Sequence, residues 1–286
     1  MKQLIFPSSV PALLLLIAAG AAPLAAEEVA NNGNLKEPVY RISKQRDVKH
    51  DPQVQPVEAL AAATNEHPLM PAIRMAKSSL SRIDTEIQDY TCTLVKRENI
   101  DGKVGEHEYM FLKVRHQPFS VYMYFLGPAN IKGRECLYIN GEHNNKLIAH
   151  EGGAKLFLPT VQIDPNGLIA MRGQRYPITE VGVRNLTARL VEVAEEDAKF
   201  AECDVKHFQG AKVNGRVCNC IQVTHPVRRA NFRYHIARIF IDQEDQVPVR
   251  FESYDWPARE GGKPVLLEEY TYMNMKFNVG LTDADF

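Results

Sequence analysis

The sequence predicts an α+β protein built on one large, curved antiparallel β-sheet, with a helix before the sheet and a second helix inserted within it. Three features support this fold class. An apolar stripe of helical period begins near Pro68, a long series of apolar strands with short turns follows, and a second helical stripe over 179–194 interrupts that series. Strands joined by short turns pair antiparallel, and helices placed outside runs of strands indicate an α+β fold. We expect the two helices to cover the concave face of the sheet.

The first 26 residues form a predicted signal peptide. One basic side chain, Lys2, precedes an apolar run over 12–22, and small residues continue to Ala26 before Glu27. This order is typical of a secretory signal. The run is shorter than the roughly 20 apolar residues that a membrane span needs, so we expect cleavage and no stable span, with a membrane anchor as the alternative. No cysteine lies near the cleavage site. We therefore expect a soluble exported product, with the periplasm as its compartment.

Residues 27–67 are polar and show no sustained apolar period, which predicts a disordered leader. The folded domain is predicted over 68–286 and begins with a helix. Its apolar positions step by three and four along the chain, as one face of a helix does. They are Leu69, Ile73, Ala76, Leu80, Ile83 and Ile87. Polar residues fill the other face, so this helix packs by one side only.

Two groups of strands follow, separated by the second helix. The first group is predicted at Tyr90–Glu98, Glu106–Arg115, Phe119–Leu126, Arg134–Ile139, Lys146–His150 and Lys155–Leu158. The Asn140-Gly141 pair between two of them is a strong hairpin signal. The inserted helix is predicted at Thr179–Ala194, with Thr179 as its N-cap. The second group of strands is predicted at Ala201–Phe208, Arg216–Thr224, Phe232–Asp242, Val247–Tyr254 and Pro264–Val279.

Several strands of the first group are apolar on both faces. In a sheet with one solvated face, apolar and polar side chains should alternate, so these strands need cover on both sides or must line an apolar cavity. Solid packing against the helices and a ligand-holding groove beneath a helical lid both remain open. For the groove, the predicted apolar binding residues are Met110, Leu112, Val114, Val121, Met123, Phe125, Leu137 and Ile139.

Five cysteines permit disulfides in an exported protein, and the odd number leaves at least one thiol free within a monomer. The Asn214-Gly215 turn could bring Cys203 opposite Cys218 or Cys220, while the connectivity of these three with Cys92 and Cys136 stays open. The spacing does not match a zinc site. The nine histidines are scattered, so we predict no metal site and no cofactor.

Composition and motifs weigh against nucleic-acid binding and catalysis. The formal net charge is −1, without the basic excess of nucleic-acid-binding proteins. The sequence contains no G-x-S-x-G elbow, H-E-x-x-H pair or phosphate-binding loop. Arg250 and Glu252 share a strand face, as do Glu268 and Tyr270. Such pairs could do acid–base work, but cross-strand ion pairing is the simpler interpretation. We predict no catalytic residues.

Two resemblances follow from specific stretches of the chain. The hairpin from Ile239–Asp242 into Val247–Glu252, together with the closing strand, is similar to the LolA/LolB superfamily of lipoprotein carriers. The chain also resembles family 1571 of uncharacterised bacterial domains over roughly residues 68–286. The stretches that carry this second match are Tyr90–Lys96, Pro118–Tyr122, Lys132–Glu135, Arg175–Thr179 and Glu268–Tyr272. The superfamily resemblance implies an open half-barrel capped by helices that holds an apolar ligand.

The functional hypothesis is therefore an exported, non-enzymatic protein of the cell envelope. It would bind a lipid, an acylated protein or another apolar ligand, and its expected partner is a lipid or lipoprotein. Two alternatives stay open. The domain could be an envelope sensor or protein-interaction module without a lipid ligand, or a hydrolase with an unrecognised site.

Overall fold

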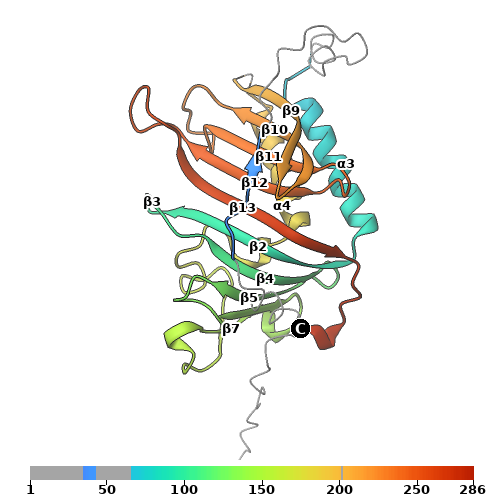
Figure 1. Cartoon of the computed structure of the whole chain (residues 1–286), viewed down its shortest axis with the longest axis vertical. Helices are drawn as coiled ribbons and strands as arrows, with labels where there is room; N and C mark the ends of the chain where they lie inside the picture. The colour runs from blue at the N-terminus through green and yellow to red at the C-terminus, as the bar shows by residue number, and fades with distance from the viewer. Residues whose placement is uncertain (1–34, 43–65, 201) are drawn as a thin grey trace, which may run out of the picture. The chain divides into compact units, whose positions relative to one another are not determined.

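A computed structural model of the chain describes residues 35–42, 66–200 and 202–286 (Figure 1). These residues all belong to one unit that spans Asn34–Phe286. The predicted signal peptide and most of the predicted leader lie outside the described residues. Within the part of the chain that is described, neither α-helix has the length and hydropathy that crossing a bilayer requires.

The described strands form one antiparallel sheet of thirteen strands, which confirms the predicted α+β class. Its order is β1-β9-β10-β11-β12-β13-β2-β4-β5-β6-β7-β8, with β3 pairing β2 outside this path. The strands are β1 (Tyr40–Arg41), β2 (Asp89–Ile100), β3 (Lys103–Val104), β4 (Glu108–Arg115), β5 (Ser120–Gly127), β6 (Glu135–Ile139), β7 (Leu147–His150), β8 (Val161–Ile163), β9 (Asp204–Val213), β10 (Arg216–Thr224), β11 (Ile236–Asp242), β12 (Pro248–Asp255) and β13 (Val265–Phe277).

The last strand joins the two groups of strands that the sequence predicts. β13 lies between β12 and β2, so the C-terminal strand completes a sheet that the N-terminal group begins. In this ladder Glu268 stands opposite Glu98, and Tyr270 stands opposite Lys96. Residues about 170 positions apart in the sequence thereby become neighbours on one face of the sheet.

The two helices, α3 (Met70–Glu86) and α4 (Val183–Asp197), pack against each other and against one face of the sheet. In Figure 1, α4 lies behind strands β10 to β13 and α3 runs beside it. Ion pairs link the two helices, with Arg184 Nε 2.6 Å from Asp84 Oδ1 and Lys77 Nζ 2.5 Å from Glu195 Oε1. The predicted stripe of α3 is confirmed, since Ile73 is buried and Ile83 fully so. We call the sheet face beneath the helices the inner face.

The inserted helix begins four residues later than the sequence predicts. Thr179 belongs to a short 3-10 turn, Ile178–Glu180, and the N-cap of α4 is Gly182, whose φ is 110°. The backbone N–H of Val183 donates to the Tyr90 hydroxyl at 3.0 Å. A Cβ atom at Gly182 would lie 2.8 Å from that hydroxyl oxygen. This tertiary contact, which no local capping signal reveals, sets the start of the helix.

One predicted strand is absent, and a different one takes its place. Lys155–Leu158 is not extended, because the chain forms a 3-10 turn at Gly153–Lys155 and then an exposed loop. The edge strand is β8, where Val161 pairs with Ala149 and Ile163 with Leu147. The segment predicted as a strand at 155–158 instead presents three exposed apolar side chains, Leu156, Phe157 and Leu158.

Part of the segment predicted as a disordered leader is ordered. Residues 35–42, which we call the strap, lie on the outer face of the sheet and include β1. Tyr40 pairs with Val213 of β9, and its ring lies 4.0 Å from the guanidinium carbon of Arg250. Arg250 and Glu252 are buried there and pair with each other along β12 at 2.8 Å. Each also makes a cross-strand ion pair, as the sequence suggested, Arg250 with Glu269 and Glu252 with Arg238. The strap covers this buried charge, which explains why a polar segment is held against the domain.

All five cysteines are free thiols. The pairing of Cys203 with Cys218 or Cys220, which the sequence left open, is not formed, because the register places other residues opposite these two. Cys218 faces Ala211 and Cys220 faces Phe208. Cys203 directly precedes Asp204, the residue of β9 that pairs with Thr224. It therefore lies several residues along the ladder from Cys218 and Cys220.

Candidate ligand-binding cavity

A cavity of about 1140 Å³ lies between the inner face of the sheet, the two helices and the connection from β8 to α4. Its volume lies slightly above the usual range for small-molecule sites, roughly 300–1,000 Å³. The helical wall is made of small and aliphatic side chains from one side of each helix. These are Ala72, Ala76 and Ser79 of α3 with Leu69 at its N-cap, and Leu186, Leu190, Val193 and Ala194 of α4, beside the polar Asn185, Thr187 and Arg189 of α4.

The sheet supplies the second apolar wall, and both groups of strands contribute to it. Each residue shares the face of the partner directly opposite it in the ladder, so register determines which side chains reach the cavity. The apolar sheet residues that line it include Leu94, Met110, Met123, Phe125, Ile221, Val223, Ala237, Ile239, Ile241 and Phe251. The space is therefore bounded mainly by hydrocarbon, on the helical side and on the sheet side alike.

Three of the eight predicted binding residues line the cavity, namely Met110, Met123 and Phe125. Three others, Leu112, Val114 and Val121, lie on the same strands but pack inside the solid core. The sequence left open both solid packing against the helices and a ligand-holding groove. The sheet contains both arrangements.

The last two predicted residues, Leu137 and Ile139, point to the opposite face. Leu137 stands opposite Tyr122 and Ile139 opposite Ser120, whereas Cys136 stands opposite Met123 and lines the cavity. A shift of one residue in β6 exchanges its two faces. Counting alternation within β6 alone could not determine which of its faces is the inner one.

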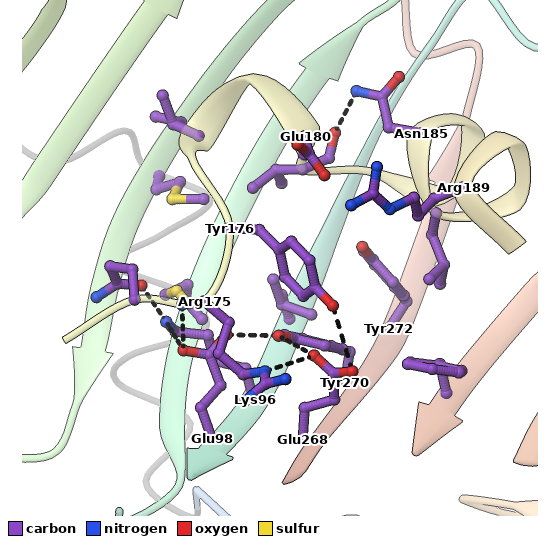
Figure 2. A pocket seen from close by; sticks show the side chains of 18 of the residues that line it. Lys96, Glu98, Arg175, Tyr176, Glu180, Asn185, Arg189, Glu268, Tyr270 and Tyr272 are labelled. Atoms are coloured by element: carbon purple, nitrogen blue, oxygen red, sulfur yellow. Dashed lines mark hydrogen bonds and ion pairs between the residues drawn. The ribbon is translucent and has the colours of Figure 1, made fainter. Parts of the chain in front are cut away.

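A polar cluster interrupts the apolar wall (Figure 2). Glu98 and Glu268 face each other across β2 and β13. The Tyr270 hydroxyl lies 2.5 Å from Glu98 Oε1 and 3.3 Å from Glu268 Oε2. Burial, and then the two carboxylates, raise the pKa of Tyr270 well above its usual value. The phenol therefore stays protonated and donates to the carboxylates.

Two positive charges balance these carboxylates. Lys96 Nζ lies 3.4 Å from Glu98 Oε2 and also hydrogen-bonds Gln174. Arg175 Nε lies 3.0 Å from Glu268 Oε2. The Arg175 side chain remains 28% exposed while Glu268 is only 6% exposed. Lys96 Nζ also lies 3.4 Å from Glu108 Oε2. Carboxylates and cations thus form a paired, polar patch in an otherwise mainly apolar cavity.

The connection between β8 and α4 carries part of this cluster over the sheet. Tyr176 lies next to Arg175, and its hydroxyl is 3.3 Å from Glu268 Oε1. Burial and the negative charge of Glu268 raise the pKa of Tyr176. Figure 2 shows Tyr176 above Glu268, with Arg175 and Lys96 on the same side of the site. The loop therefore closes the polar end of the cavity from the side opposite the sheet.

The sequence interpretation missed this cluster as a site. Glu268 and Tyr270 were interpreted as members of cross-strand ion pairs, but the cation that Glu268 binds, Arg175, comes from a loop 93 positions away. A signal was present in β2, where Lys96 and Glu98 follow Tyr90, Cys92 and Leu94 on a strand face that is otherwise apolar. Polar residues at positions that should be buried indicate a specific partner.

A second buried cluster holds the end of α4. His225 is fully buried, its Nε2 lies 3.0 Å from Asp197 Oδ2, and the Tyr234 hydroxyl donates to the same oxygen at 2.9 Å. Phe232 stacks on the imidazole with a centroid separation of 3.9 Å. Because His225 is inaccessible, this arrangement fixes the helix against the β10–β11 connection. Among the described residues, no three histidine, cysteine or acidic side chains converge in a way that could hold a metal ion.

The chain was compared with protein families, curated proteins and solved structures. A model of the family described as "Protein of unknown function (DUF1571)" matches residues 87–286. No curated protein matches the chain. The sequence resemblance to this family is confirmed, and the solved structures that are similar include a LolA superfamily protein, as the sequence suggested.

The chain is similar to three solved structures, among others. A putative outer membrane lipoprotein-sorting protein domain from Vibrio parahaemolyticus has 14% identity and a TM-score of 0.35, covering 74% of this chain and 94% of that one. A LolA superfamily protein from Nitrosomonas europaea has 11% identity and a TM-score of 0.31, covering 74% and 96%. The Mycobacterium tuberculosis lipoprotein LppX has 15% identity and a TM-score of 0.37, covering 74% and 98%.

Proposed function

The chain belongs to the DUF1571 family of proteins of unknown function, and we propose that it is an exported, non-enzymatic carrier that holds a lipid or an acylated protein by its hydrocarbon chain. The observation that carries this proposal is the cavity of about 1140 Å³, walled by aliphatic side chains from the helices and both halves of the sheet. The predicted signal peptide supports the exported part of this proposal.

Hydrocarbon is the ligand chemistry that these walls favour. Each methylene moved from water into such a space contributes about 0.8 kcal/mol, which is about a fourfold gain in affinity per carbon. No comparable gain is available to a polar ligand, because most of the lining offers no hydrogen-bond partner. An acyl chain therefore suits the apolar end of the cavity.

The polar cluster favours an amphiphilic ligand that binds in one orientation. A purely hydrocarbon ligand would leave the Lys96, Glu98, Arg175 and Glu268 group without a role in binding. An amphiphile can place its chain between the helices and the sheet and its head beside the partly exposed Arg175. The carboxylates of the cluster are already held by protein donors, including the Ser253 hydroxyl at 2.8 Å from Glu268 Oε1. This supports a binding role over acid–base chemistry.

The proposal is tested by binding of a fluorescent fatty-acid probe to the purified chain, with native mass spectrometry to detect a ligand that copurifies. Ala76→Phe puts a ring into the cavity from α3, and we expect at least about a tenfold loss of probe affinity, or about 1.4 kcal/mol. Ser78→Phe puts the same ring on the exposed side of that helix and should bind like wild type. A wild-type chain with no copurified lipid and no probe binding would contradict the proposal.

A further inference from the structure

Two loops beside the cavity have large apolar side chains that are exposed to solvent. The first, between the 3-10 turn Gly153–Lys155 and β8, exposes Leu156, Phe157 and Leu158, with Phe157 82% exposed. The second, after β8, exposes Leu168 and Ile169, with Leu168 93% exposed. Exposed apolar groups gathered in one region of a soluble domain mark an interaction surface.

This patch continues into the cavity. Leu158, Val161 and Ile169 are each exposed to solvent and also line the cavity. A residue with both properties lies at an opening. The cavity therefore opens between the two loops, where apolar side chains continue from the patch into the interior.

The charge around the patch is positive. Lys155 directly precedes the first apolar run and Arg172 follows the second, and both are exposed. The backbone N–H of Gly153 donates to the carbonyl of the exposed Lys132 at 2.7 Å, which brings a third cation beside the first loop. Residues 153–172 contain two cations and one acid, Asp164, for a formal charge of +1.

We propose that residues 155–158 and 168–172 dock on a bilayer that contains anionic lipids, and that the cavity takes up its ligand there. Large apolar side chains flanked by lysine and arginine are the pattern of surfaces that insert at a lipid interface, and anionic headgroups attract the flanking cations. The opening then faces the source of acyl chains. The uptake part of this inference rests on the proposed function, whereas docking does not.

The test is flotation of the purified chain with phosphatidylcholine vesicles, with and without phosphatidylglycerol. The variant Phe157→Ser/Leu168→Ser should lose at least about tenfold in vesicle partition, because it removes two large inserting side chains. The control Val217→Ser/Val279→Ser removes two exposed apolar residues outside the loops and should float like wild type. Lys155→Gln/Arg172→Gln should remove only the preference for phosphatidylglycerol.

Binding of the fluorescent fatty acid from solution, without vesicles, separates the two proposals. Docking is supported if the loop variant loses vesicle partition and keeps wild-type affinity for the dissolved probe. Docking is overturned if wild type binds the probe but does not float with either vesicle. It is also overturned if the loop variant floats normally while sedimentation shows that it has lost self-association, since the patch would then join two copies. Failure of wild type to bind the probe overturns uptake and the proposed function.

Discussion

Glu98 and Glu268 stand directly opposite each other in the ladder between β2 and β13, on the face that lines the cavity. Like charges in directly opposed positions destabilise a sheet. Here Lys96 approaches Glu98 along the same strand, and Arg175 approaches Glu268 from the loop above. These two cations stabilise the pair together with the Tyr270 hydroxyl, which contacts both carboxylates, so the loop and the sheet depend on each other at the polar end of the cavity.

Lys96→Met should destabilise the protein strongly. The lysine is 9% exposed and Glu98 only 7%, and removing one partner of a buried pair costs about 3–5 kcal/mol. Urea unfolding measures the change. Adding Glu98→Gln to this variant should restore part of the loss, while Lys103→Met, at an exposed site, should stay within about 0.5 kcal/mol of wild type. A Lys96→Met variant as stable as the Lys103 control would show that the cluster does not hold the fold.

The free energy of unfolding should decrease at alkaline pH, in part because of Tyr270. Its pKa is raised by burial, Glu268 and Glu98, so the folded protein keeps a proton that the unfolded chain releases above about pH 10. The stabilisation is complete below that pH and decreases as pH rises further, by about 1.4 kcal/mol per pH unit for one group. Unfolding of Tyr270→Phe across this range should show a slope smaller by that amount. An unchanged slope would contradict the assignment.

His225→Leu should loosen the end of α4. The substitution leaves the buried Asp197 carboxylate with the Tyr234 hydroxyl but without its hydrogen bond to the imidazole, at a cost of about 1–3 kcal/mol. Glu196→Gln is the control, because this neighbouring residue makes only an exposed ion pair with Lys199, whose loss should cost under about 1 kcal/mol. Equal urea midpoints for the two variants would rule out a stabilising role for the cluster.

Tyr40→Ala should expose the buried charges beneath the strap. The Tyr40 ring lies 4.0 Å from the guanidinium carbon of Arg250, and a desolvated contact of this kind contributes about 2 kcal/mol. Tyr40→Phe keeps the ring and should retain most of the stability. Thermal unfolding of the two variants measures the difference. If both unfold at the same temperature, the ring contact with Arg250 does not anchor the strap.

Local periodicity was sufficient to predict most of the elements. The stripe from Leu69 to Ile87 predicted α3, and the apolar runs of both groups predicted the strands near their observed positions. Tertiary contacts decided the exceptions. The start of α4 depends on Tyr90, which lies 93 positions before Val183, and the ordered strap depends on Arg250 beneath Tyr40.

The site was harder to predict than the fold. Met110, Met123 and Phe125 were identified because both faces of their strands are apolar, which requires cover or a cavity. Leu137 and Ile139 were assigned to the wrong face, because the register of β6 is set by its pairing with β5. Arg175 completes the polar cluster from a loop, and no periodic signal places a loop residue over a strand.

The carrier function is tested most directly by the affinity of the purified chain for a series of fatty acids of increasing length, measured by displacement of the fluorescent probe. The apolar walls predict that the Kd falls about fourfold for each added methylene until the chain fills the cavity, and then levels off. In Ala76→Phe the Kd should level off at a shorter chain length, whereas Ser78→Phe should follow wild type. An affinity independent of chain length would contradict the account, because the ligand would then not be held by its hydrocarbon.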